Sequence, residues 1–231
     1  MGPAWFPDSR SVLVADTDAV NQKSIFRRVD VETGEESLVF DATFQSIWPL
    51  VAIAPDGKAL FYTMGEPDTD PAMNRLRLLR RDLDSGTETE LYRAVSDGVG
   101  FFGLSISPDG RQLAFMANVG PNKRDLMTLS TAGGTPVVLY RGGYANPQAQ
   151  AAVWTRDGRH ILFKAEDGTQ RTRVWAVPTD GGPARKLDLA TQGIGKMDLS
   201  PDGSRLLFSG TKSKQELWVI KNLLPSPLTR N

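Results

Sequence analysis

Hydrophobic and polar residues alternate in short runs along the chain, and a turn-forming triplet interrupts the runs at regular intervals. The clearest case is ISPDGRQLAF at residues 106–115, where Pro-Asp-Gly separates two such runs. Proline presets the first dihedral of a tight turn, and glycine accepts the left-handed conformation that ends it. Alternation predicts strands with distinct faces, so this segment is expected to form a β-hairpin.

The same hairpin pattern occurs five times, with its turn aspartates 45 to 53 residues apart. These aspartates are Asp8, Asp56, Asp109, Asp157 and Asp202. Large apolar residues stand three and five positions beyond the turn in every copy, on one face of the strand. Another apolar column precedes the turn and consists of Trp5, Ile53, Ile106, Trp154 and Leu199. Because the whole hairpin repeats, the aspartate is interpreted as a turn former rather than a catalytic group.

Each repeat holds short β-type runs in the number that a propeller blade requires. In the third repeat they cover 104–107, 112–119, 125–131 and 136–141. A period in the forties with turns at fixed phase predicts an all-β fold, a β-propeller of four-stranded antiparallel blades. The chain is interpreted as one domain, 1–231, with blades at roughly 4–41, 48–94, 102–141, 150–189 and 195–231. The fifth repeat lacks a clear fourth strand.

The motif SPDGxxLxF, followed by a W/L-x-V strand and a GG or TG turn, resembles the TolB-like β-propeller repeat. The resemblance covers residues 5–222 and implies a fold rather than one activity. Such repeats occur in the periplasmic protein TolB, in propellers that precede prolyl-oligopeptidase-like hydrolases, and at the ends of large bacterial signalling proteins. TolB-like rings usually have six blades, so five repeats imply either an incomplete six-bladed ring with open edges or a ring that closes in an unusual way. Together with ELWVIKNLLP at 216–225, this resemblance implies the C-terminal part of a larger bacterial protein.

Composition excludes several classes of partner and site. The 27 basic and 27 acidic residues cancel, so no nucleic-acid partner is expected. No apolar run approaches the roughly 18 residues that a membrane span needs. There is no cysteine, and the N-terminus has no signal-peptide pattern. The composition leaves a periplasmic and a cytoplasmic location equally open.

Motifs for catalysis or metal binding are weak. The GxGxxG match at 98–103 leads into a strand, where a dinucleotide site needs a helix. The SxxK match at 209–212 stands at a strand end, and the single histidine, His160, flanks a turn. The carboxylates of Glu66, Asp68 and Asp70 lack the remaining ligands of a calcium loop. We therefore predict no catalytic residue, no metal site and no cofactor.

The candidate binding site lies on the loops that connect consecutive blades, because these loops meet at one face of a propeller. They cover 41–48, 94–103, 142–151 and 190–197 and combine aromatic and amide side chains with few charges. The candidate residues are Gln45, Trp48, Asp97, Phe101, Phe102, Tyr144, Asn146, Gln148, Gln150, Gln192 and Lys196. This mixture suits a protein or peptide partner. The alternative is that the aromatic rings pack between blades.

The sequence therefore favours a non-enzymatic binding or scaffold propeller that recognises a protein or peptide through its central-channel face. Two alternatives stay open. The chain could be an accessory propeller of a larger signalling protein or hydrolase, or a hydrolase or lyase that acts on a sugar or lactone in the channel. Open blade edges also predict self-association.

Overall fold

The structure is a computed structural model of the whole chain. It describes residues 4–18, 20–21, 23–43, 50–66, 74–96, 100–120, 123–144, 152–166, 172–189, 194–200, 203–211 and 215–221. Over these ranges the regular elements are strands in five antiparallel sheets, and no helix occurs among them.

Each sheet follows the chain from its first strand to its last. Blade 1 contains β1 (Ala4–Trp5), β2 (Ser11–Asp18), β3 (Lys23–Asp30) and β4 (Glu36–Thr43). Blade 2 contains β5 (Val51–Ile53), β6 (Ala59–Glu66), β7 (Asn74–Asp82) and β8 (Glu88–Ser96). Blade 3 contains β9 (Phe101–Ile106), β10 (Gln112–Gly120), β11 (Lys123–Ser130) and β12 (Val137–Tyr144). Blade 4 contains β13 (Ala152–Trp154), β14 (His160–Glu166), β15 (Thr172–Pro178) and β16 (Arg185–Lys186). Blade 5 contains β17 (Ile194–Leu199), β18 (Arg205–Thr211) and β19 (Gln215–Lys221).

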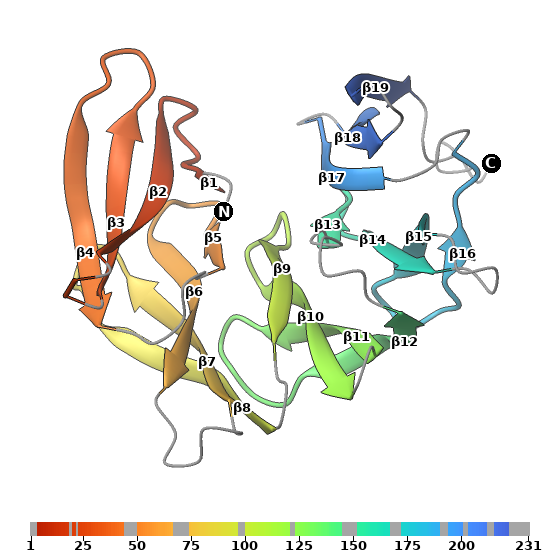
Figure 1. Cartoon of the computed structure of the whole chain (residues 1–231), viewed down its shortest axis with the longest axis horizontal. Coiled ribbons are helices and arrows are strands. Elements are labelled where there is room, and N and C mark those ends of the chain that lie inside the picture. The colour runs from red at the N-terminus through yellow and green to blue at the C-terminus, as the bar shows by residue number, and fades with distance from the viewer. Residues whose placement is uncertain are drawn as a thin grey trace, which may run out of the picture.

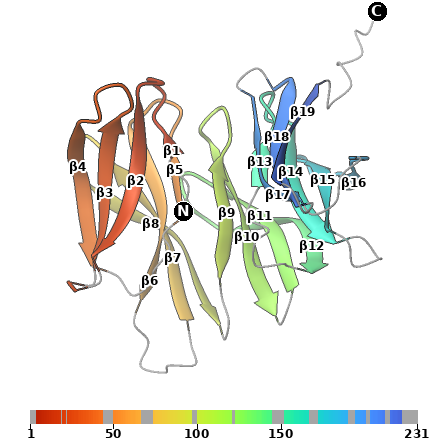
Figure 2. The same cartoon turned by 45° about the horizontal axis from the view of Figure 1, so that its top comes forward.

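The blades are arranged around a common centre, as a propeller requires (Figures 1 and 2). The first strand of each blade contacts the first strand of the next, from β1 through β5, β9 and β13 to β17. The sequence-based prediction of an all-β propeller is confirmed, and four of the five blades have four strands. Blade 5 has three strands among the described residues, and the segment after Lys221, where a fourth strand would follow, lies outside them.

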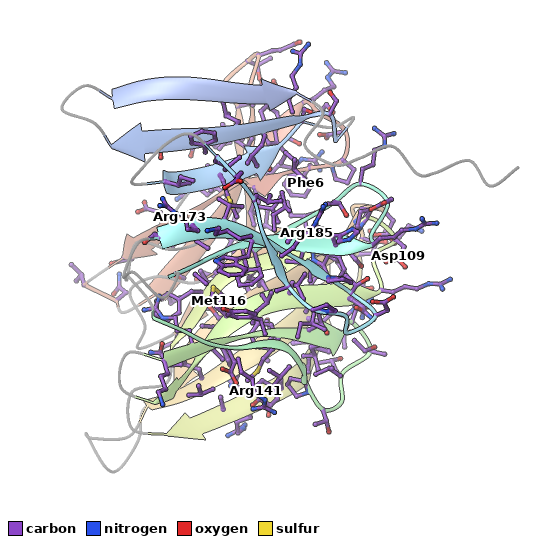
Figure 3. All side chains as sticks on the ribbon, turned by 90° about the vertical axis from the view of Figure 1, so that its right-hand side faces the viewer. Phe6, Asp109, Met116, Arg141, Arg173 and Arg185 are labelled. Carbon is purple, nitrogen blue, oxygen red and sulfur yellow. The ribbon has the colours of Figure 1, made fainter. Side chains whose placement is uncertain are left out.

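The two ends of the blades have different connections. The Pro-Asp-Gly turns and the links from third to fourth strand lie at one end, which we call the turn face. The strand ends that lead from the second strand to the third and from one blade to the next lie at the opposite end, which we call the channel face. Figure 3 shows this separation, with Asp109 at one end of the blades and Arg173 at the other.

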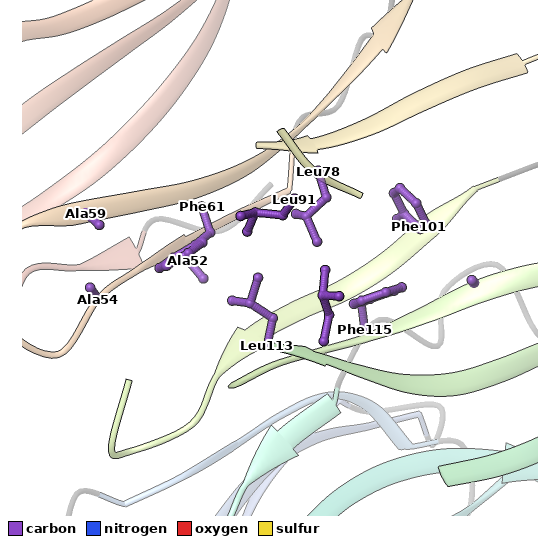
Figure 4. Close-up of a cluster of buried hydrophobic side chains, with 11 residues drawn as sticks. Ala52, Ala54, Ala59, Phe61, Leu78, Leu91, Phe101, Leu113 and Phe115 are labelled. Carbon is purple, nitrogen blue, oxygen red and sulfur yellow. The ribbon is translucent and has the colours of Figure 1, made fainter. Parts of the chain in front are cut away.

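The hydrophobic core consists of layers between consecutive blades. Phe61, Leu78 and Leu91 of blade 2 meet Leu113 and Phe115 of blade 3 in one such layer (Figure 4). The column three residues beyond the turn is fully buried in four blades, as Leu60, Leu113, Ile161 and Leu206. The side chains of a layer therefore stay buried only where a sheet lies on each side of that layer.

The turns of neighbouring blades also pack on one another. Gly110 has φ +73°, and a Cβ built on it would lie 3.3 Å from Cδ of Pro55 in the preceding turn. A Cβ built on Gly57 would likewise lie 3.6 Å from Cδ of Pro7. The glycine thus supplies both the left-handed conformation and the space for the proline of the preceding blade.

The outer faces of the terminal blades are exposed at positions that are buried elsewhere. Trp5 is 58% exposed, whereas Trp154 in the same column is 8% exposed. Leu207 is 41% exposed, whereas the matching Leu162 is fully buried. No described core cluster joins blade 5 to blade 1, and in Figure 1 the blades follow an arc with these two at its ends.

Two glycine-to-alanine substitutions separate the energetic contribution of the contact between turns from that of backbone strain. Gly34 and Gly110 both have φ +73°, but a Cβ on Gly34 would meet nothing within 4 Å. Gly34→Ala is expected to cost about 1–2 kcal/mol of unfolding free energy for the left-handed conformation alone. Gly110→Ala is expected to cost more, because its Cβ also crowds Pro55. Urea denaturation measures both, and equal losses would show that the contact between turns contributes nothing.

Candidate functional site

Most of the residues predicted for the channel face lie outside the described parts of the chain. These are Gln45, Trp48, Asp97, Asn146, Gln148, Gln150 and Gln192, together with Asp68 and Asp70 of the acidic loop. Tyr144 ends β12 and Lys196 lies within β17, with only their backbone described. Phe101 and Phe102 are the candidates whose side chains the structure describes.

Phe101 belongs to the core between blades 2 and 3. It is 7% exposed, and its ring lies 5.2 Å from the ring of Phe115 and 6.0 Å from that of Tyr92. For this residue the alternative interpretation holds, in which the aromatic ring packs between blades. Its ring is not available to a partner at the channel face.

Phe102 points to the other side of blade 3 and is partly exposed. The guanidinium carbon of Arg124 lies 3.6 Å from the centroid of its ring. Arg124 is 6% exposed, and its Nε donates a hydrogen bond to Oδ1 of Asn118 at 2.8 Å. A desolvated cation–π contact of this kind contributes about 2 kcal/mol. Burial lowers the pKa of Arg124, while guanidinium groups stay charged in proteins.

Because Gly100 has no side chain, the ring of Phe102 packs directly against the backbone at this position. A Cβ on Gly100 would lie 2.8 Å from Cε2 of Phe102 and 3.3 Å from Nδ2 of Asn118. The following residues form strand β9, so this part of the GxGxxG match opens a strand, as expected, and not a helix. The glycine serves close packing of an aromatic ring at the channel-face end of blade 3.

Lys164 is a buried amine that sequence reasoning missed. It is 2% exposed in β14, and its Nζ donates a hydrogen bond to the carbonyl oxygen of Ile194 at 3.3 Å. Burial lowers its pKa to about 8. The matching position of blade 3 is occupied by Met116. A lysine at the strand position where blade 3 has methionine was the signal that could have found it.

Four of the five turn aspartates lie in the described residues and hold their turns, as predicted, whereas Asp202 lies outside them. The backbone N–H two residues later donates to Oδ1 of Asp8, Asp56, Asp109 and Asp157 at 2.9 to 3.1 Å. The bond from the Arg10 N–H, helped by Ser11 and Arg28, lowers the pKa of Asp8 to about 2. Hydrogen bonds from their turns also lower the pKa values of Asp109 and Asp157, so these two carboxylates and that of Asp8 stay ionised at neutral pH.

The described residues hold no group of three or more His, Asp or Glu side chains that could bind a metal ion. His160 begins β14, and its backbone N–H donates to Oγ1 of Thr155 at 3.0 Å. No helix in the described ranges is long and apolar enough to cross a membrane.

The buried amine of Lys164 makes stability depend on pH in a defined direction. Below pH 8 the amine is protonated in both states. Between about 8 and its ordinary value of 10.5, the unfolded chain keeps a proton that the folded chain has released. The free energy of unfolding is therefore expected to rise with pH in this window, by about 3 kcal/mol in total for this group.

Lys164→Met tests this dependence, because methionine occupies the matching position of blade 3. The variant is expected to lose the alkaline rise and to be at least as stable as the wild type at pH 7. Lys58→Met, at an exposed lysine, provides the control and is expected to keep the rise. Denaturation between pH 7 and 10.5 measures both, and an unchanged rise in Lys164→Met would contradict the burial of a titrating amine.

Comparisons with known proteins agree on the fold and differ in activity. No family model matches the chain. It is 26% identical over 110 residues to the uncharacterized peptidase YuxL of Bacillus subtilis, which covers 45% of this chain and 16% of that protein. The crystal structure of TolB from Acinetobacter baumannii aligns with a TM-score of 0.73 and 15% identity, over 96% of this chain and 51% of that one. Oligogalacturonate lyase from Vibrio parahaemolyticus aligns with a TM-score of 0.55 and 13% identity, over 96% and 77%.

The chain thus spans about half the length of the TolB structure and 16% of the peptidase. At these identities the structural matches establish the fold only and give no evidence about the activity of this chain. Repeat pattern, blade topology and structural similarity together show that the chain has a β-propeller fold similar to that of TolB.

Proposed function

We propose that the domain is a non-enzymatic binding propeller that recognises a protein or peptide through its channel face. The observation that carries the proposal is that the contacts of the Phe102 ring fix its position. The buried guanidinium of Arg124 packs on one face of this ring, with its carbon 3.6 Å from the ring centroid. Gly100 has no Cβ that would clash with the ring. A partly exposed aromatic ring fixed in this way loses little conformational entropy on binding.

Two further observations support a binding role. Aromatic anchors beside polar groups are typical of protein interfaces, and the channel-face candidates Tyr144, Asn146 and Gln148 have this composition. The turn carboxylates that the structure describes are committed to backbone N–H groups, which supports a scaffold function for the turn face.

Peptides selected from a phage-displayed random library on the immobilised protein provide the test. Phe102→Ala is expected to weaken the selected peptides at least tenfold, because it removes the aromatic anchor. Phe102→Leu keeps most of the packing against the blade 3–4 layer and is expected to weaken them several-fold without a comparable loss of stability. Leu38→Ala, at a residue 61% exposed on outer strand β4, is the control and should bind normally.

Failure of the selection, or selected peptides that bind Phe102→Ala as well as the wild type, would overturn the channel-face proposal. Phe101→Ala is expected to lower stability by about 3–5 kcal/mol, the usual cost of truncating a buried phenylalanine. That variant therefore reports on the core and not on the site.

A second candidate role is that of an accessory propeller whose open ends are covered by another sheet. Trp5, Val14 and Leu207 are 58, 38 and 41% exposed, although the matching residues of the inner blades are buried or partly buried. Where no other sheet covers them, we infer that the exposed faces of blades 1 and 5 pair between copies of this chain. Apolar sheet faces of this kind are sites of association.

Light scattering over a range of protein concentrations tests the pairing. The wild type is expected to associate, and Trp5→Glu combined with Leu207→Glu is expected to remain monomeric, because each charge would be buried in the contact. Val137→Glu changes a residue 59% exposed on outer strand β12 and should leave association intact. A monomeric wild type, or equal association in all three proteins, would contradict the proposed pairing.

A further inference from the structure

Aromatic rings pack together in the layer between blades 3 and 4, and Phe102 belongs to this layer. Its side chain packs on the same core cluster as the partly buried rings of Tyr140 and Trp175. The Tyr140 ring lies 4.8 Å from the buried Phe163 ring and 6.0 Å from the Trp175 ring. Tilted aromatic pairs at these separations attract one another. Phe102 extends this aromatic packing to the channel face.

A positive charge lies directly against the Phe102 ring. The guanidinium carbon of Arg124 is 3.6 Å from the ring centroid, and the quadrupole of an aromatic ring attracts a cation to its face. A side chain in van der Waals contact with the exposed part of the ring comes within about 7 Å of this carbon. Because Arg124 is 6% exposed, salt screens its charge only weakly. A second cation at this ring would therefore meet a like charge and a quadrupole that Arg124 already uses.

The facing blade adds a second guanidinium at the same end of the layer. Arg173 pairs in register with Ala165, which belongs to the core cluster between blades 3 and 4. Residues paired across two strands have their side chains on one face of the sheet, so Arg173 faces blade 3. Figure 3 shows it at the channel-face end of the blades. A cationic side chain on Phe102 would thus approach two arginines.

The carboxylate that follows Arg124 in the chain faces another layer. Asp125 pairs in register with Ala117, which belongs to the core cluster between blades 2 and 3. The segments that follow β10 and β12, 121–122 and 145–151, contain no charged residue. The chain as a whole has no net charge, so a preference for one sign of charge at Phe102 would report the local field of these arginines.

We propose that Arg124 sets the specificity of the channel-face site, so that the site accepts an uncharged aromatic side chain of a peptide, tyrosine above all, and excludes lysine and arginine. This inference rests on the peptide-binding role proposed above and names the chemistry of the peptide's anchor. The tyrosine ring packs against Phe102 in an offset or edge-to-face arrangement. A lysine or arginine in its place is repelled by Arg124, which is the kind of unfavourable contact that gives an interface its specificity.

Three capped tripeptides that differ only in their central residue provide the test. The central residue is tyrosine, lysine or Nε-acetyl-lysine between two glycines, and acetylation of lysine removes its charge. Binding is followed in ¹H–¹⁵N spectra through the backbone amide of Phe102 and the Nε–H of Arg124, which is buried and hydrogen-bonded to Asn118. The tyrosine peptide is expected to bind most tightly. The lysine peptide is expected to bind roughly tenfold more weakly than the acetyl-lysine peptide.

Variants of Arg124 show whether its charge causes the discrimination. Arg124→Met removes the charge and keeps a long side chain over the ring, so the lysine peptide is expected to bind it at least as well as the acetyl-lysine peptide. Arg124→Lys keeps the charge and is expected to keep the discrimination. The matched control is Arg28→Met, which removes a guanidinium 4.5 Å from the Phe6 ring in blade 1 and should leave all three affinities unchanged.

Equal binding of the lysine and acetyl-lysine peptides to the wild type would overturn the proposal, and this comparison needs no variant to fold. Discrimination that persists in Arg124→Met would overturn it as well. Phe102→Leu separates these results from failure of the proposed function. If it weakens all three peptides while Arg124 has no effect on their ranking, the channel-face site stands and only its specificity is wrong. No shift with any of the peptides at millimolar concentration would overturn both.

Discussion

The structure depends on face-to-face packing of consecutive four-stranded sheets. A blade has apolar residues on both faces, so each of its faces stays buried only while a neighbouring sheet covers it. Val14 and Phe115 occupy the same position of the repeat, yet one is 38% and the other 1% exposed, because blade 1 has no described neighbour on that side. Burial in this fold is thus set by the position of a blade in the arc as much as by the residue itself.

Within the layers, polar atoms are tolerated where the packing also satisfies them. Between blades 1 and 2, the rings of Phe26 and Phe40 stack at 4.4 Å, and Arg81 lies over Phe40 at 4.5 Å. The hydroxyl of Tyr62 donates to Glu88, which also accepts a hydrogen bond from Arg81. Burial and the Glu88 carboxylate raise the pKa of Tyr62, so it remains a donor at physiological pH. Such a network aligns two blades as well as stabilising them.

The repeat made the strands, the turns and the buried columns predictable, because one alignment of five segments contains all three. It predicted that Asp109 holds a turn and that Leu113 and Phe115 lie in a layer. It left the fate of Phe101 and Phe102 open, because neighbouring residues on a strand point to opposite faces and both faces of a blade are covered. The stacking of Arg124 on Phe102 and the contact of Lys164 with Ile194 depend on side chains from different strands or blades. No period in the sequence encodes those pairings.

The polar exceptions in the layers differ in what satisfies them. Arg124 has Asn118 and an aromatic ring, and Lys164 has a backbone carbonyl of the next blade, so each has a partner within the fold. The indole N–H of Trp154 has no such partner among the described residues, although it lies at the most loosely packed junction between turns. If its role were only to fill space, phenylalanine would fill much of the same volume without burying a donor. Filling space alone therefore does not account for a tryptophan at this junction.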